Sequence, residues 1–172
     1  CDGGSSYLDW NAQSRLVIKR YEELAHSHRI DAGQALVAGP GRADDCAAPS
    51  DWSDYDDSMR PYMDGSYFAD RVPSTRLQVP LTPGADYGPQ ACPEAQYKAI
   101  AKAWADHLKQ RGWFERAVIF AEDEPPPEVL PRLAQHAGWI VAADRDWKRH
   151  IIATVPATPK QAPLLDPVLG IY

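Results

Sequence analysis

The chain has 172 residues, 44% of them hydrophobic and 24% charged, which is the composition of a globular domain long enough to bury a core. Its formal net charge of −6 argues against nonspecific binding to nucleic acid, which needs a basic surface. No apolar run approaches the roughly 18–20 residues that a membrane-spanning helix needs. We therefore expect one domain over residues 1–172, with no nucleic-acid partner and no transmembrane segment.

The three cysteines are relevant to whether the protein is exported from the cytoplasm. The sequence begins Cys1-Asp2-Gly3-Gly4-Ser5-Ser6, which resembles the start of a mature bacterial lipoprotein with Cys1 lipidated; the alternative is a fragment boundary that falls on a cysteine. Cys46 and Cys92 lie in Pro/Gly/Ala-rich loops. In an exported protein they would form a disulfide worth roughly 4 kcal/mol, and two unpaired thiols are the other possibility. The cysteine and histidine spacings do not fit a zinc site.

The first half of the chain predicts two helices and two strands. Residues 11–28 have the periodicity of an amphipathic helix. The face expected to be buried consists of Leu16, Val17, Tyr21, Leu24 and Ala25. Residues 35–38 are a strand candidate, 52–63 predict a helix that Pro61 bends or shortens and that ends at Asp64-Gly65, and 74–80 alternate weakly like a strand.

The second half predicts further helices and strands in alternation. Residues 93–111 form the clearest helix, with Pro93 at its entry and Gly112 at its end. The other expected elements are a buried strand at 116–121, a helix at 128–136 stopped by Gly138, an ambiguous segment at 139–142, a strand at 150–155 and a last strand candidate at 168–172. This order predicts a parallel sheet covered by helices. An open doubly wound sheet and a (β/α)₈ barrel both fit it, but a full barrel needs more strands than are visible.

The segment with the clearest chemical signal follows the 116–121 strand. The apolar run stops at Glu122, Asp123 and Glu124, and Pro125 then breaks the chain. Carboxylates at the carboxyl end of a buried strand lie where α/β and barrel enzymes place their chemistry. Adjacent side chains point to opposite faces of an extended strand, so a bend is needed for Asp123 and Glu124 to approach one substrate. The pair is therefore a candidate active site.

Several phrases, taken together in order, resemble glycoside hydrolase family 123 and the uncharacterised bacterial domains allied to it. The resemblance covers most of the chain, from about residue 15 onwards. The phrases are Arg20-Tyr21-Glu22 leading to His28-Arg29-Ile30, Asp64-Gly65-Ser66-Tyr67-Phe68, His107-Leu108 through Gly112-Trp113, and Asp123-Glu124-Pro125.

The resemblance implies a TIM-barrel-like (β/α)₈ fold, here an incomplete barrel or a fragment. It also implies a retaining exo-N-acetylhexosaminidase that uses substrate assistance, in which the 2-acetamido oxygen of the sugar is the nucleophile. Asp123 would orient and stabilise the acetamido group, and Glu124 would be the general acid and base. This mechanism needs neither a metal nor an organic cofactor.

Three further residues are candidates for binding the substrate, which would be a glycan or glycoconjugate. Trp52 and Tyr67 flank loops and offer aromatic faces on which a sugar ring can stack, and Asp64 can bind sugar hydroxyls. Asp64-Gly65 is also an ordinary turn sequence. The alternative function is a noncatalytic carbohydrate-binding or cell-surface module on the same scaffold. We expect a secreted, periplasmic or cell-surface lipoprotein, and the sequence leaves its oligomeric state open.

Overall fold

A computed structural model describes residues 12–31, 37, 40, 46–83, 91–155 and 162–170. Its contacts divide the chain into two compact units, one made of residues 1–39 and 53–75 and the other of residues 40–52 and 76–172. The lipoprotein-like start at Cys1 and most of the strand candidate at 35–38 lie outside the described residues. The single domain expected over residues 1–172 stays a prediction.

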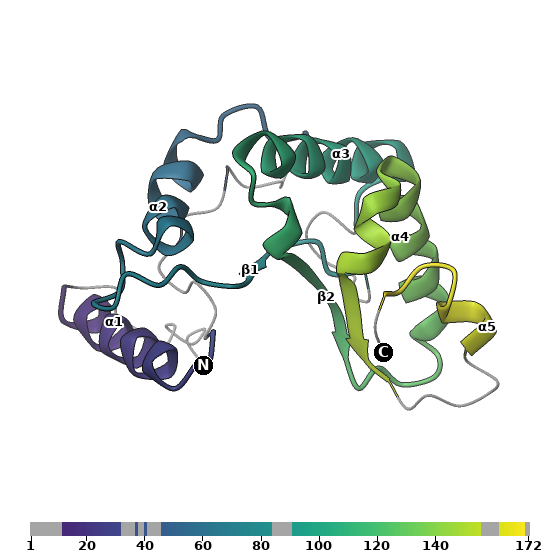
Figure 1. The fold of residues 1–172 in the computed structure, drawn as a ribbon. Helices are drawn as coiled ribbons and strands as arrows, with labels where there is room; N and C mark the ends of the chain where they lie inside the picture. The colour runs from purple at the N-terminus through teal and green to yellow at the C-terminus, as the bar shows by residue number, and fades with distance from the viewer. Residues whose placement is uncertain are drawn as a thin grey trace, which may run out of the picture. The chain divides into compact units, whose positions relative to one another are not determined.

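The first unit contains α1 (Ala12–Ser27) and α2 (Ser53–Asp64) (Figure 1). Helix α2 ends before Gly65, as the sequence predicts, and Pro61 lies inside it without shortening it. Gly65 has a φ of 82°, and a Cβ atom there would lie 2.3 Å from the carbonyl oxygen of Arg71. Glycine is therefore the residue that this turn can hold without displacing the neighbouring backbone.

The apolar face of α1 does not lie where the periodicity predicts. Tyr21 is 69% exposed and Leu24 is 56% exposed, and Leu16 and Val17 are exposed as well, whereas Glu22 is buried. The prediction that this stripe faces the core is therefore wrong. Helical periodicity shows that a helix has an apolar face, but it does not show that the same chain covers that face.

A buried hydrogen-bonded cluster holds α1 within its unit. Tyr62 and Tyr67 donate their hydroxyl hydrogens to Oε2 of Glu22, with oxygen–oxygen distances of 2.9 and 2.6 Å. One helical turn further on, the ring of His26 stacks on Phe68 with centroids 3.6 Å apart. Burial is the main cause that raises the pKa of both tyrosines, so their hydroxyls stay protonated and act as donors.

Replacing Glu22 by alanine is expected to destabilise the first unit by about 1–3 kcal/mol, because it leaves the buried Tyr62 hydroxyl without this acceptor. Replacing Glu23, a half-buried neighbour in a loose 3.8 Å ion pair with Lys19, is the control and should cost at most about 1 kcal/mol. Hydrogen exchange of the α1 amides measures the difference. Equal exchange rates in the two variants would contradict the role assigned to Glu22.

The second unit contains a three-stranded parallel sheet in the order β1-β2-β3 (Figure 1). The strands are β1 (Leu77–Gln78), β2 (Ala117–Asp123) and β3 (Ile151–Thr154). The structure is thus a small α/β one with parallel strands, but the (β/α)₈ barrel prediction is wrong, also as an incomplete barrel. The three strands in the described part of the chain, one of them two residues long, are too few and too sparse to form a closed barrel, which takes eight.

The helices of this unit are α3 (Glu94–Arg111), η3 (Phe114–Arg116), α4 (Leu130–Ala143), η4 (Arg145–His150) and α5 (Ala162–Leu165). Helices α4 and η4 pack against β2, and α3 and α5 pack against α4. Helix α3 ends as predicted at Gly112, whose φ is 70°. The alternating strand residues Ala117, Ile119 and Ala121 are buried, together with the apolar faces of α3 and α4. No helix in the described part of the chain has the length and apolarity to cross a membrane.

Two predictions in the last third of the chain are wrong. Helix α4 does not stop at Gly138 but continues to Ala143, so the ambiguous segment 139–142 is helical. Gly138 does not have the positive φ of the helix-ending Gly112, and a Cβ atom there would make an ordinary contact of 3.7 Å with the side chain of Val168. Residues 168–170 form no strand, and the remaining two residues of that candidate lie outside the described residues.

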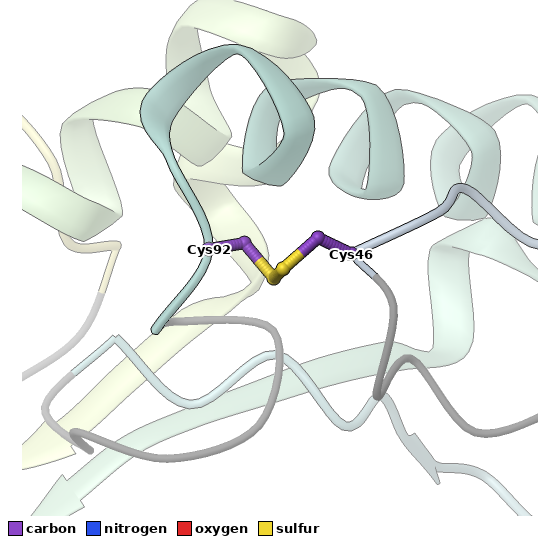
Figure 2. The surroundings of a disulfide bond; sticks show 2 residues. All are labelled: Cys46 and Cys92. Carbon is purple, nitrogen blue, oxygen red and sulfur yellow. A yellow bond between two sulfur atoms is a disulfide. The ribbon is translucent and has the colours of Figure 1, made fainter.

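Two contacts, one at Cys46 and one at Trp52, attach the segment before α2 to α3 and to the residue Cys92 that precedes it. Cys46 and Cys92 form a disulfide with their Cα atoms 5.6 Å apart, and Figure 2 shows that the bond joins this segment to the chain just before α3. The ring of Trp52 stacks on His107 of α3 with centroids 4.1 Å apart and meets Trp104 edge-on. Of the two possibilities that the sequence leaves open, the disulfide is the one present.

The buried His150 joins η4 to the start of β2 in its neutral form. Its Nδ1 lies 2.8 Å from the carbonyl oxygen of Ala117 and donates to it, while its Nε2 accepts from Nε of Arg149 at 3.1 Å. A protonated ring would place a second donor against the Arg149 guanidinium. Burial, with a contribution from Arg149, lowers the pKa of His150 below its ordinary value of 6.5.

We expect the free energy of unfolding to fall as the pH drops from 7.5 to 5.5. A histidine with a lowered pKa in the folded state takes up its proton first in the unfolded chain, so its stabilising effect is present above about pH 6.5 and is lost below it. His136, whose pKa burial also lowers, acts in the same direction. Urea denaturation should show a shallower pH dependence for His150→Gln than for His28→Gln, an exposed control. Identical slopes would exclude His150 as a cause.

Candidate functional site

The acidic segment lies at the carboxyl end of β2, as the sequence predicts. Strand β2 includes Glu122 and Asp123, and the chain turns at Glu124 before the buried Pro125. Glu122 is half-buried, whereas Asp123 and Glu124 are exposed. The parallel neighbour β3 ends at the same edge with Thr154, so the two strands bring polar side chains together there.

A β-bulge sets the direction of Asp123. Phe120 pairs with Ile152 and Asp123 pairs with Thr154. Between these two pairs, β2 contains one more residue than β3. Strict alternation from Ala121 would place Asp123 on the helix-covered face of the sheet. The extra residue places it instead on the less covered face, beside the exposed Thr154, and bulges are common next to active sites.

Thr154 holds both members of the acidic pair. Its hydroxyl donates to Oδ1 of Asp123 at 2.6 Å, while its hydroxyl and carbonyl oxygens both lie 3.0 Å from the backbone nitrogen of Glu124 and accept from it. Glu124 has a φ of 46°, a left-handed conformation that is unfavourable for a residue with a Cβ atom. Such strain occurs often at functional sites. The chain therefore bends between the two carboxylates, which is what their approach to one substrate requires.

The arrangement can act on a substrate from two positions. Asp123 keeps one carboxylate oxygen on the Thr154 hydroxyl, and its other oxygen can accept a hydrogen bond from a ligand N–H group. The carboxyl group of Glu124 follows the turn and can donate or accept a proton. No group of three or more His, Cys, Asp or Glu side chains among the described residues is arranged to hold a metal ion.

Trp52, predicted to bind sugar, lies in the second unit as a half-buried residue against α3. One face of its ring is taken up by His107 and its edge meets Trp104. The contacts show that Trp52 fastens the segment after Cys46 to the helix. Trp52 therefore has a structural role in this unit. Its binding of sugar stays a prediction.

Asp64 and Tyr67 belong to the first unit, and each is engaged inside it. Oδ1 of Asp64 accepts from the backbone nitrogen of Ser66 at 2.8 Å, and the hydrogen bonds from Ser66 lower the pKa of Asp64. The Tyr67 hydroxyl donates to Glu22, and its ring stacks on Tyr62 with centroids 4.1 Å apart. The hydrogen bond between Ser66 and Asp64 is typical of a turn, which is the other function that the sequence allows for Asp64-Gly65.

The sequence prediction missed Thr154, which makes the closest contacts with the acidic pair. The signal was available in part, because Thr154 is the last polar residue of the strand expected at 150–155, and parallel strands end at one edge. The bulge that aligns Thr154 with Asp123 depends on pairing between segments 31 residues apart and has no local signature.

Comparisons of the chain with family models, curated proteins and solved structures give no match, so the assignment of a function rests on the residues of the site.

Proposed function

We propose that the chain is a retaining exo-N-acetylhexosaminidase that acts by substrate assistance through Asp123 and Glu124. The observation that carries the proposal is the fixing of both residues by Thr154 at the carboxyl edge of parallel strands, across a bulge and a left-handed turn. Parallel α/β sheets carry their reactive groups at this edge. The resemblance to glycoside hydrolase family 123 supplies the reaction class.

In the proposed reaction the acetamido oxygen of the sugar attacks C1 while the bond from C1 to the leaving oxygen breaks. Glu124 gives its proton to the leaving oxygen, and Asp123 accepts a hydrogen bond from the acetamido N–H as positive charge develops on the oxazolinium ion. Water then attacks C1, the bond from C1 to the acetamido oxygen breaks, and the water loses a proton to Glu124, which restores the acid. Thr154 is a positioning residue here, because it touches Asp123 rather than the substrate.

The second candidate function is a noncatalytic carbohydrate-binding or cell-surface module. It is favoured by the exposure of both Asp123 and Glu124, since a general acid usually lies in a recessed, desolvated position. Such a module would bind a glycan or glycoconjugate without turning it over.

We also propose that the protein works outside the cytoplasm, as a secreted, periplasmic or cell-surface protein. The disulfide between Cys46 and Cys92 supports this, because such bonds persist mainly in oxidising compartments.

The experiment that tests the function is hydrolysis of 4-nitrophenyl N-acetyl-β-galactosaminide and N-acetyl-β-glucosaminide by the oxidised 172-residue chain. Turnover of either substrate, with none of the corresponding 2-hydroxy glycosides, is expected if the acetamido group is the nucleophile. Turnover of the 2-hydroxy glycosides at the same rate would contradict substrate assistance. If neither substrate is turned over but calorimetry shows saturable binding of N-acetylhexosamine oligosaccharides, the enzyme proposal is rejected in favour of the binding module.

A further inference from the structure

A cavity of about 350 Å³ lies in the second unit, away from the acidic pair. It is lined by Arg145, Asp146, Lys148, Arg149, Leu169 and Gly170. The first four belong to η4, which directly precedes β3, so the cavity lies towards the amino end of that strand. Asp123 and Glu124 lie at the carboxyl edge, and the proposed glycosidase reaction makes no use of this cavity.

Close packing of the last described segment against η4 builds one wall of the cavity. The backbone nitrogen of Gly170 donates to the carbonyl oxygen of Ile151 at 3.0 Å. A Cβ atom on Gly170 would lie 2.7 Å from the carbonyl oxygen of Lys148 and 2.8 Å from Cα of Arg149. The wall is therefore formed by backbone in tight contact, with the buried Leu169 beside it.

The charge in the cavity is positive. Three cations face one carboxylate, that of Asp146, which already accepts from Nζ of Lys109 at 2.7 Å. Arg149 is paired with Glu115 at 2.6 Å. Among the described residues, the side chains of Arg145 and Lys148 have no ion pair or hydrogen bond. A hollow between two uncompensated cations suits an anion, because an oxyanion accepts charge-assisted hydrogen bonds from both.

We infer that this cavity binds a small molecule through a phosphate or sulfate group, with Arg145 and Lys148 as its main ligands. Both groups are tetrahedral oxyanions, and each presents several oxygens to the guanidinium and the ammonium at once. Leu169 gives the attached organic part an apolar surface to contact. The chain is acidic overall, with a net charge of −6, so an anion that binds here is held by this local cluster rather than by a general positive field.

The test is a titration of the ¹⁵N-labelled 172-residue chain with sodium phosphate, sodium sulfate and sodium acetate, at an ionic strength held constant with sodium chloride. We expect the amide signals of Leu169 and Gly170 to shift and saturate with phosphate, sulfate or both. Saturation by phosphate alone assigns a phosphate ester, and saturation by sulfate alone assigns a sulfate ester. Shifts that do not saturate, or that acetate reproduces equally, would overturn the inference.

Variants make the test specific to the two cations. Arg145→Ala with Lys148→Ala should weaken binding by about a hundredfold or more, because two charge-assisted hydrogen bonds are lost and each is worth at least about tenfold in affinity. The control, Lys98→Ala with Lys102→Ala, removes the same charge from exposed positions of α3 outside the cavity and should change the affinity by less than about twofold. All four side chains lie at the surface, so folding should be retained, as circular dichroism can verify. Equal weakening in both double variants would contradict the assigned site.

Discussion

Replacing Glu124 by glutamine is expected to lower the turnover of N-acetylhexosaminides by about 10²–10⁴-fold, the usual contribution of a general acid and base. Glutamine has nearly the same shape but cannot deliver a proton to the leaving oxygen. The two contacts that fix residue 124 come from its backbone nitrogen, so the substitution leaves the turn intact. Steady-state kinetics with both chromogenic substrates, together with a thermal melt of each protein, measures the effect.

Substrates with different leaving groups test the role of Glu124 as the acid more specifically. A 4-nitrophenolate departs without much protonation, whereas a sugar hydroxyl needs the acid, so the loss should be larger on a disaccharide than on the chromogenic substrate. Glu122→Gln is the matched control, because it makes the same change of charge at the half-buried neighbour two residues before Glu124. If the two variants lose equal turnover, or if neither does, Glu124 is not the acid.

Removing the disulfide by replacing Cys46 and Cys92 with serine is expected to lower the free energy of unfolding by about 4 kcal/mol. Pairing residues 46 positions apart restricts the unfolded chain, and the chain-entropy relation gives this magnitude for a loop of that length. The loss should appear as a shift of the urea midpoint of the second unit, because both cysteines belong to it.

The wild-type chain in reducing buffer is the matched comparison for the double serine variant. It should unfold at the same urea concentration as the variant, and the variant itself should not respond to the reductant. If the oxidised and reduced wild-type chains unfold at the same midpoint, the bond contributes nothing to stability. The anchoring of this segment would then rest on Trp52 and its stacking on His107.

Local signals in the sequence account for the elements that were predicted well. Helix α3 has Pro93 at its start and a left-handed Gly112 at its end, both of which act through nearby backbone. Strand β2 is an apolar run that stops at acids and prolines. The place of Asp123 and Glu124 at its carboxyl end follows from that local pattern.

The predictions that failed depend on contacts between distant segments. The exposure of Tyr21 and Leu24 is set by what packs against α1, which the helical period does not contain. Gly138 lies inside α4, between the buried Ala137 and Ile140 of the same helix. Alternating helices and strands predict parallel pairing, but closure into a barrel depends on strand number and stagger across the whole sheet. The bulge at Asp123 is likewise a property of two paired strands.

The interleaved order of the two units limits how the protein can be dissected. Residues 40–52 belong to the second unit, although the 53–75 portion of the first unit separates them from the rest of it. A chain shortened to residues 76–172 would retain Cys92 but not its partner, and would uncover the faces of Trp104 and His107 that Trp52 contacts. A shortened chain that preserves the contacts of this unit would have to keep residues 46–52 and replace residues 53–75 with a linker. Its boundaries are therefore set by spatial contacts rather than by position along the chain.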